Sequence, residues 1–296
     1  MSFASNVKAE ICKAQLSKKC CALAECYGIL LYCNTFSADQ IKIVTESPEF
    51  AARLPRVFRK AFGFGFDSVS EPVGKMSFVI SAPEKLESVF QCYGFQRDNC
   101  ITLHVNFGVL ENSCCRAAFL LGAFLAGGSV TDPEKRYHLE FATGHIKVGA
   151  ETCALMQDMG LSAKQTVRGG SCILYFKQSE RIADFLTFLG APVCAMKVME
   201  AKVEKDLRNG VNRRVNCETA NLTKVVDAAQ DQIAAIRKLR AGGVLDTLPE
   251  KLRQAAKLRC ENPEATLTEL AEMSVPPTSK SAMNHRMRKL LELSRE

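Results

Sequence analysis

Hydrophobic and polar positions follow one plan twice in the first two hundred residues, at an interval of roughly 95 positions. Each copy begins with an apolar helical pattern and continues with alternating segments that are typical of half-buried strands. The paired segments are 22–36 and 117–130 (helix), 40–46 and 137–143 (strand), 48–63 and 147–160 (helix), 66–70 and 162–168 (strand), 75–81 and 171–177 (strand), and 83–94 and 179–190 (helix). This order predicts a duplicated domain of mixed helices and strands, with repeats at about 18–95 and 113–192.

A glycine stands inside the first helical pattern of each repeat, at Gly28 and at Gly122. Glycine inside a helix costs about 0.5–1 kcal/mol relative to alanine, so these two positions need compensation. A close approach between two helices supplies it, because a residue without a Cβ lets two backbones come together. We therefore expect the two helices to pack against each other at Gly28 and Gly122. A glycine that is merely tolerated in a buried helix is the alternative.

The pattern changes over residues 199–245, where the chain becomes polar and rich in asparagine, alanine and charged residues. Val225, Ala229 and Ile233 recur at helical spacing, and Gly242–Gly243 ends that pattern. We expect a linker here, with a helix in its second half.

The last fifty residues, 246–296, predict a compact all-helical domain. Its helices are expected at 248–262, 266–273 and 279–294. Thr266 is placed as the N-cap of the middle helix with Glu269 three residues later, which is a capping box. The third helix has an apolar stripe opposite a basic face. Such a unit indicates a helix-turn-helix, whose recognition helix enters the DNA major groove.

The polar face of the third helix carries the residues expected to contact DNA. Ser281, Asn284 and Arg288 are spaced to face the same way. Asparagine and arginine pair bidentately with adenine and guanine, and each such pair discriminates by about 1–3 kcal/mol. Neighbouring basic residues are expected to contact phosphates, which position a protein without specifying sequence. The predicted DNA-contacting residues are Thr266, Ser279, Lys280, Ser281, Asn284, His285, Arg286, Arg288, Lys289, Arg213 and Arg214.

Two alternatives stay open for these basic residues. The face of the third helix could be a solvated surface, or one that a protein partner covers. Arg213 and Arg214 lie in the segment 212–224. This segment could contact DNA, or it could hold the linker against either domain, and the sequence favours neither interpretation.

Composition is that of an ordinary globular protein, with 47% hydrophobic and 24% charged residues, which excludes disorder, collagen and coiled coil as descriptions of the whole chain. The formal net charge of +7 is compatible with a polyanionic partner. No apolar run reaches the ~18 residues of a membrane span, and the N-terminal residues lack the apolar region of a secretory signal. We therefore expect a cytoplasmic protein with no membrane partner, and the predicted DNA contacts lead us to expect that it is nucleoid-associated.

The 14 cysteines are expected to be reduced and mostly structural. None stands in a C-x-x-C spacing, the strongest sequence signal of zinc or redox chemistry. Many lie in apolar stretches, where a free cysteine behaves as a small hydrophobic residue. The four histidines are too scattered along the chain for a metal cluster. We expect no metal and no cofactor.

The segment LLGAFLAGG (120–128) resembles LAGLIDADG, the signature of homing endonucleases. Those enzymes carry two such helices, and each helix delivers one carboxylate to the divalent metals that activate water. Alignment of Gly122 with the first glycine of the motif puts Gly127 where the acid belongs. The same alignment of Gly28 puts Cys33 at the equivalent position of the first repeat.

Neither Gly127 nor Cys33 can hold Mg²⁺, which requires hard oxygen ligands. Asp39 and Asp132 stand five or six residues too late in the chain to replace the missing acids. The sequence also lacks the phosphate-binding loop G-x-x-x-x-G-K-[ST], the elbow G-x-S-x-G and the zinc motif H-E-x-x-H. We therefore expect no catalytic residues and no enzyme activity; a residual metal-dependent nuclease is the alternative.

Three stretches in this order resemble the WhiA family, and the resemblance runs over nearly the full length. They are FLLGAFLAGGSVTDPEKRYHLEF (119–141), NRRVNCETANLTK (212–224) and TSKSAMNHRMRKL (278–290). The resemblance implies an α+β fold, in which a duplicated LAGLIDADG-like αββαββα domain (1–198) and a linker with a helix (199–245) are followed by an all-α helix-turn-helix domain (246–296). The family often has arginine where this chain has Leu121.

The resemblance also implies a function. It points to a sequence-specific factor that binds double-stranded DNA and regulates transcription, with nuclease activity lost. Such proteins are linked to cell division and chromosome segregation, and to sporulation in spore-forming actinomycetes. The implied partners are double-stranded DNA and other regulatory proteins such as a sigma factor.

A protein-interaction adaptor that docks through the duplicated domain, with only weak non-specific DNA binding, is the alternative function. The solvent-facing strand residues distinguish the adaptor function from DNA binding by this domain. A protein-docking face is expected to be apolar or acidic, whereas a DNA-binding face is expected to be basic. Six basic residues in the strand regions favour DNA: Lys42, Lys75, Arg136, Lys147, Arg168 and Lys177.

Overall fold

The computed structural model describes residues 2–16, 18–71, 74–96 and 102–295. The chain divides into two compact units, Met1–Lys205 and Asp206–Glu296. Each unit has a hydrophobic core of its own, so each is described by itself.

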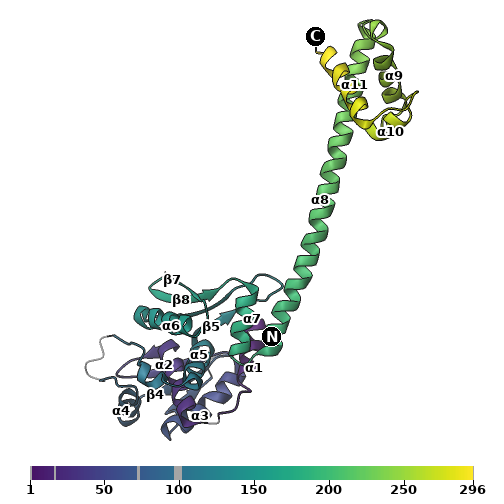
Figure 1. Cartoon of the computed structure of the whole chain (residues 1–296). Coiled ribbons are helices and arrows are strands. Elements are labelled where there is room, and N and C mark those ends of the chain that lie inside the picture. Colours follow the sequence, from purple (N-terminus) through teal and green to yellow (C-terminus); the bar gives the residue numbers. More distant parts are fainter. Residues whose placement is uncertain (1, 17, 72–73, 97–101, 296) are drawn as a thin grey trace. The chain divides into compact units, whose positions relative to one another are not determined.

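The first unit contains the same arrangement of elements twice (Figure 1). The first repeat comprises α2 (Lys19–Tyr32), β1 (Thr35–Phe36), β2 (Ile41–Thr45), α3 (Pro48–Phe62), β3 (Ser68–Ser70), β4 (Met76–Ile80) and α4 (Pro83–Cys92). The second comprises α5 (Ser113–Gly127), β5 (Gly128–Val130), β6 (Leu139–Thr143), α6 (Ile146–Asp158), β7 (Lys164–Arg168), β8 (Ser171–Phe176) and α7 (Ser179–Phe188). Each repeat forms a four-stranded antiparallel sheet, in the orders β1-β2-β4-β3 and β5-β6-β8-β7. The predicted αββαββα duplication is confirmed.

The sheets bury one face, as the alternating pattern predicts. In β6 and β8 the buried positions are Leu139, Phe141 and Thr143, and Cys172, Leu174 and Phe176. Residues between them are partly exposed on the other face. The strands β1 and β5 are part of the implied αββαββα order, but the hydrophobic pattern did not locate them, because two or three residues are too few to show a period of two.

Among the elements that the structure describes, the helices α2 and α5 make the most extensive contact. A Cβ on Gly28 would lie 2.0 Å from the carbonyl oxygen of Phe119, and a Cβ on Gly122 would lie 2.1 Å from that of Glu25. The two glycines therefore let the helix backbones touch, as predicted.

A helix that the sequence did not predict, α1 (Phe3–Ile11), precedes the first repeat. Ser2 caps it by accepting a hydrogen bond from the backbone N–H of Ser5 at 3.2 Å. Val7 and Ile11 are fully buried, so one face of α1 belongs to the core. The carboxylate of Glu10 accepts hydrogen bonds from the backbone N–H groups of Val193 and Cys194, at 2.8 and 3.0 Å.

Those two N–H groups belong to the first turn of α8, a single helix of 50 residues from Pro192 to Ala241. The sequence predicted a helix only in the second half of this region. The first half is also helical because it contains no proline after Pro192 and only one glycine, Gly210.

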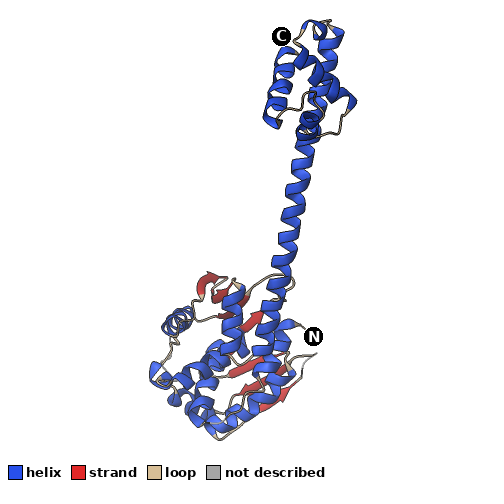
Figure 2. Cartoon of the chain, turned by 45° about the vertical axis from the view of Figure 1, so that its right-hand side comes forward, coloured by secondary structure: helices blue, strands red, loops and turns tan. Residues whose placement is uncertain are grey.

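The second unit is helical throughout (Figure 2). Its elements are the end of α8, the short 3₁₀ helix η3 (Leu245–Thr247), α9 (Glu250–Glu261), α10 (Leu267–Glu272) and α11 (Lys280–Leu293). Ile236 of α8, Ala255 of α9, Leu270 of α10 and Met283 of α11 meet in its core. The three predicted helices are present within two residues of their predicted ends. Of the helices in the described residues, none has the length and apolarity needed to span a membrane.

Candidate DNA-binding surface

The helix α11 presents one face to the core and the other to solvent. Met283, Met287 and Leu290 are at most 1% exposed. Ser279 begins the helix as its N-cap and accepts a hydrogen bond from the backbone N–H of Ala282 at 3.2 Å. Burial of this stripe fixes the rotation of α11, so the residues between the buried positions must face outward.

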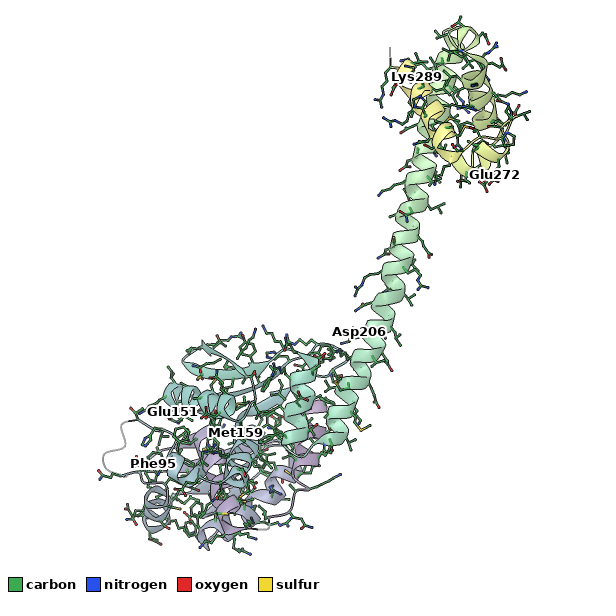
Figure 3. All side chains as sticks on the ribbon, viewed as in Figure 1. Phe95, Glu151, Met159, Asp206, Glu272 and Lys289 are labelled. Atoms are coloured by element: carbon green, nitrogen blue, oxygen red, sulfur yellow. The ribbon has the colours of Figure 1, made fainter. Side chains whose placement is uncertain are left out.

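The outward face carries the residues that the sequence predicted for DNA contact. Lys280, Ser281, Asn284, His285, Arg288 and Lys289 are all exposed, and Arg286 is half-buried. Lys289, labelled in Figure 3, has the carboxylate of Glu292 at 3.9 Å, which is a weak surface pair. The structure therefore places most of the predicted polar residues of α11 on the solvent-exposed side of the helix.

Thr266 and Ser279 have a different role from the other predicted residues. The hydroxyl of Thr266 accepts from the backbone N–H of Glu269 at 3.3 Å, and the carboxylate of Glu269 accepts from the backbone N–H of Thr266 at 2.6 Å. The predicted capping box is thus present. Because both hydroxyls hold helix N-termini, these residues position α10 and α11.

Arg213 and Arg214 are exposed on α8. Residues 206–228 are all exposed, and Ala229 is the first position of α8 after them that is buried. The structure therefore does not place these two arginines on the surface formed by α11, and their exposure gives no support to a locking role.

A buried arginine that the sequence did not single out organises the second unit. Arg259 is 2% exposed, and burial lowers the pKa of its guanidinium from the usual value. Its Nη1 donates to the carbonyl oxygen of Ala265 at 2.6 Å. The signal was available in the sequence, since Arg259 follows Ala255 by four positions on the apolar face of α9.

A cavity of about 330 Å³ lies beside this arginine. Lys224, Thr266 and Lys280 are among the residues that line it. It therefore places two ammonium groups next to the first turn of α11, where the helix N-terminus also favours an anion such as a phosphate.

In the first unit, the positions that correspond to the LAGLIDADG acids hold no carboxylate. A Cβ on Gly127 would lie 2.6 Å from the carbonyl oxygen of Ala142 and 3.1 Å from the ring of Tyr32, so an acidic side chain does not fit there. The thiol of Cys33 donates to the carbonyl oxygens of Leu30 and Thr35, each at 3.2 Å. Burial raises the pKa of Cys33 to about 12, which keeps it neutral.

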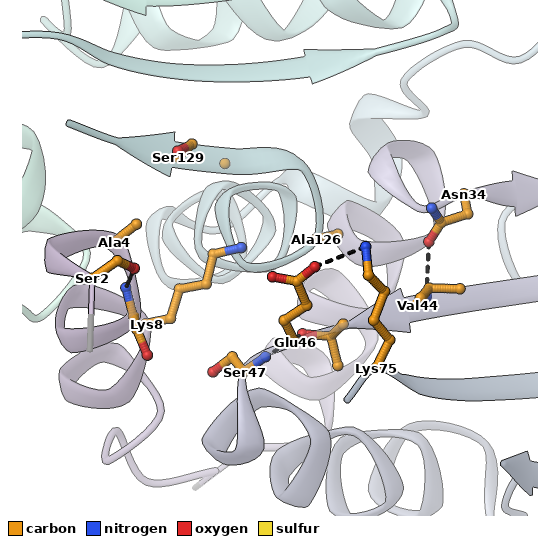
Figure 4. A pocket seen from close by; sticks show the side chains of 13 residues that line it. Ser2, Ala4, Lys8, Asn34, Val44, Glu46, Ser47, Lys75, Ala126 and Ser129 are labelled. Atoms are coloured by element: carbon orange, nitrogen blue, oxygen red, sulfur yellow. Dashed lines mark hydrogen bonds and ion pairs between the residues drawn. The ribbon is translucent and has the colours of Figure 1, made fainter. Parts of the chain in front are cut away.

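A cavity of about 560 Å³ adjoins these helix ends, with Asn34 after α2 and Ala126 and Gly128 at the end of α5 (Figure 4). The ammonium of Lys8 points into it and donates to the carbonyl oxygen of Leu125 at 3.0 Å, and burial lowers the pKa of Lys8. Two lysines line this cavity, and its carboxylate, Glu46, pairs with Lys75 at 2.8 Å. This donor set does not suit Mg²⁺.

Asp39 and Asp132 do not supply the missing carboxylates. Both are exposed. Asp132 holds a turn, where its Oδ1 accepts from the backbone N–H of Glu134 at 3.0 Å.

The solvent-facing side of the two sheets carries residues of mixed character. In each sheet, four solvent-facing residues lie next to one another on neighbouring strands. They are Thr35, Lys42, Val79 and Ser68 in the first sheet and Ser129, Glu140, Tyr175 and Lys164 in the second. Two of the six basic residues that favoured DNA are not available on this face. Lys147 lies in α6 and not in a strand, and Lys75 is paired with Glu46. The sheet face therefore does not decide between DNA and a protein as its partner.

The fold and the exposed face of α11 define a class of protein that joins a duplicated LAGLIDADG-like domain to a helix-turn-helix domain. Residues 116–208 match the family described as WhiA LAGLIDADG-like domain. Residues 211–294 match the family described as WhiA C-terminal HTH domain. The chain belongs to the WhiA family.

Relatives match over the whole chain. The chain is 38% identical to the probable cell division protein WhiA of Ruminiclostridium cellulolyticum, with 99% of this chain and 97% of that protein covered. It is 36% identical to the protein of the same name from Alkaliphilus metalliredigens, with 99% and 98% covered. The crystal structure of full-length DUF199/WhiA from Thermatoga maritima has the same fold, with a TM-score of 0.59 at 21% identity, over 100% of this chain and 98% of that one.

Proposed function

We propose that this chain is a sequence-specific double-stranded DNA-binding protein that regulates transcription in cell division. The observation that carries the proposal is the row of Ser281, Asn284 and Arg288, all exposed on α11. The buried stripe of Met283 and Met287 on the opposite side of the helix holds that row outward. Proteins of the same family and of similar length are named for cell division.

Different residues of α11 have different roles in this proposal. Asn284 and Arg288 read base edges in the major groove, since their side chains can each make a bidentate pair. Lys280 and Arg286 contact phosphates and add affinity without sequence preference. Thr266 and Ser279 act through the helix N-caps they form.

We also propose that the LAGLIDADG-like domain has no nuclease activity. Gly127 has no space for an acid, and Cys33 offers a neutral thiol in place of a carboxylate. Supercoiled plasmid incubated with the protein and Mg²⁺ or Mn²⁺ is expected to remain uncut, and cleavage that copurifies with the protein would contradict this part of the proposal.

Selection of bound duplexes from a randomised library, followed by fluorescence anisotropy on the selected site, tests sequence-specific binding. The Arg288→Ala variant is expected to lose about 1–3 kcal/mol of binding free energy on the selected site. Arg240→Ala is the matched control, because Arg240 is exposed at the end of α8 and its removal changes the net charge equally. Equal losses in the two variants, or no enrichment of any sequence, would reject specific reading by α11 and favour the adaptor function.

A further inference from the structure

Four cysteines meet at the N-terminal ends of the two central helices. Cys20 and Cys21 lie in the first turn of α2, and Cys114 and Cys115 lie in the first turn of α5. Their four Sγ atoms all lie within 4.8 Å of one another. This end of the helix pair is opposite the end that carries Cys33 and the cavity of Lys8.

The cluster obeys the symmetry of the duplicated domain. Cys114 follows Cys20 by the same 94 positions that separate Gly122 from Gly28. A Cβ on Gly28 would meet Phe119, and one on Gly122 would meet Glu25, so the two helices contact each other through equivalent positions. Each repeat therefore contributes the same two sulfur atoms to one place.

The distances match the size of a single metal ion. In a tetrahedral zinc site each Zn–S bond is about 2.3 Å, so the sulfur atoms stand about 3.8 Å apart. The observed limit of 4.8 Å means that no pair of sulfur atoms has to approach by more than about 1 Å. An iron–sulfur cluster places iron and sulfide atoms between its cysteines and calls for wider spacing.

The cluster lies at the N-termini of two helices. The partial positive charge of a helix N-terminus favours the thiolate form of a nearby cysteine. Lys18 precedes α2, and its charge acts on Cys114.

We propose that Cys20, Cys21, Cys114 and Cys115 form a tetrahedral four-thiolate site for one soft divalent cation, with Zn²⁺ as the physiological type of ion. The ion joins the two repeats at the start of their central helices. Because the site exists only in the folded domain, metal binding stabilises the folded state of the first unit.

This proposal revises the expectation, based on sequence, that the protein has no metal site. That expectation rested on the absence of C-x-x-C, whereas the ligands here are two pairs of adjacent cysteines from different repeats.

Titration of the full-length reduced, metal-free protein with Co²⁺ tests the proposal. Co²⁺ in a tetrahedral thiolate site gives intense visible d–d bands together with a thiolate-to-metal charge-transfer band in the near ultraviolet. We expect these bands to saturate at one Co²⁺ per chain and to disappear when Zn²⁺ is added. We also expect added Zn²⁺ to raise the thermal unfolding temperature.

Cys20→Ser and Cys114→Ser are suitable variants, because neither side chain is fully buried. Each should lose the tetrahedral cobalt spectrum and the zinc-dependent rise in unfolding temperature while keeping the circular dichroism of the folded chain. Cys217→Ser is the matched control, since Cys217 is an exposed cysteine of α8 outside the cluster, and it should behave as the parent does. Cobalt bands that persist in both cluster variants would overturn the site. Absence of binding to the reduced parent, or peptide mapping that finds the four cysteines as two disulfides under the same reducing conditions, would also overturn it.

Discussion

The guanidinium of Arg259 donates from Nε to the side-chain oxygen of Gln232 at 3.0 Å, and both side chains are almost fully buried. This contact joins α9 to α8. The same guanidinium donates from Nη1 to the carbonyl oxygen of Ala265 in the loop before α10. One side chain of α9 thus makes hydrogen bonds to α8 and to the loop before α10, and it holds these parts of the second unit together.

Replacement of Arg259 should therefore weaken the second unit. Arg259→Met removes hydrogen bonds made by a charged donor and leaves buried acceptors without a partner, so we expect a loss of roughly 2–4 kcal/mol in the free energy of unfolding. Urea unfolding followed by circular dichroism measures it, with hydrogen exchange locating the loss in residues 229–295. Arg240→Met, at an exposed position of α8, should change stability by less than about 0.5 kcal/mol. Similar effects of the two variants would contradict this role.

A methyl group at Gly28 should be far more costly than one at Gly210. Gly28→Ala would force α2 and α5 apart, because the Cβ would lie 2.0 Å from a backbone oxygen. We expect a loss of about 3 kcal/mol in the free energy of unfolding. Gly210 is a helical glycine of α8 with open space around its Cα. Gly210→Ala should thus stabilise its helix by about 0.5–1 kcal/mol. Thermal unfolding of the two variants would show opposite shifts, and a neutral Gly28→Ala would argue against the close contact.

The buried ion pair of Glu25 and Arg53 should matter more than the exposed pair of Glu46 and Lys75. Arg53 donates to both carboxylate oxygens of Glu25, at 2.6 and 2.9 Å. Arg53→Met leaves the carboxylate buried and unpaired, which is expected to cost about 3–5 kcal/mol in unfolding free energy. Lys75→Met should cost less than about 1 kcal/mol.

The cost of Arg53→Met should depend on pH. Burial raises the pKa of Glu25 even with its partner present, and loss of Arg53 removes the interactions that oppose this rise. A carboxyl whose pKa is higher in the folded state favours folding when protonated. The destabilisation should therefore shrink as the pH falls toward the ordinary glutamate pKa of about 4.3. Urea unfolding of the parent and the variant at several pH values measures this, and a cost that grows on acidification would contradict it.

Two variants of α11 should separate affinity from sequence reading. Lys280→Ala removes an ammonium expected at a phosphate, so the slope of log affinity against log salt should become shallower by about 0.9. Asn284→Ala should leave that slope unchanged and reduce the preference for the selected site over a scrambled duplex by about 1–3 kcal/mol. Anisotropy titrations at several salt concentrations measure both quantities. A change in slope for Asn284→Ala alone would reverse the assignment of the two side chains.

Much of the fold could be predicted because it depends on periodic patterns. The repeats share their order of elements, and the glycines at Gly28 and Gly122 indicate the helix contact from the sequence alone. The cap at Thr266 and the buried stripe of Met283 and Met287 followed from spacing alone. These features are local, or recur at equal positions, and a sequence displays both kinds directly.

Features that depend on long-range contact could not be predicted in the same way. The helical spacing places Arg259 on the apolar face of α9, but its partners are carbonyl groups of the following loop, and no local pattern shows that these groups meet the guanidinium. Lys8 reaches α5 across 117 positions. The cysteine cluster forms only when the two repeats pack together. In the sequence it is indicated only by two pairs of adjacent cysteines that are separated by the length of one repeat.

The equal contributions of the two repeats bear on the ancestry of this domain. Each repeat supplies one glycine to the helix contact and two sulfur atoms to the cluster. Two identical copies of a single repeat, related by a two-fold axis, would bury the same surface patch on both partners. A homodimer of one such repeat would therefore contain the complete helix contact and all four thiols without any fusion into a single chain.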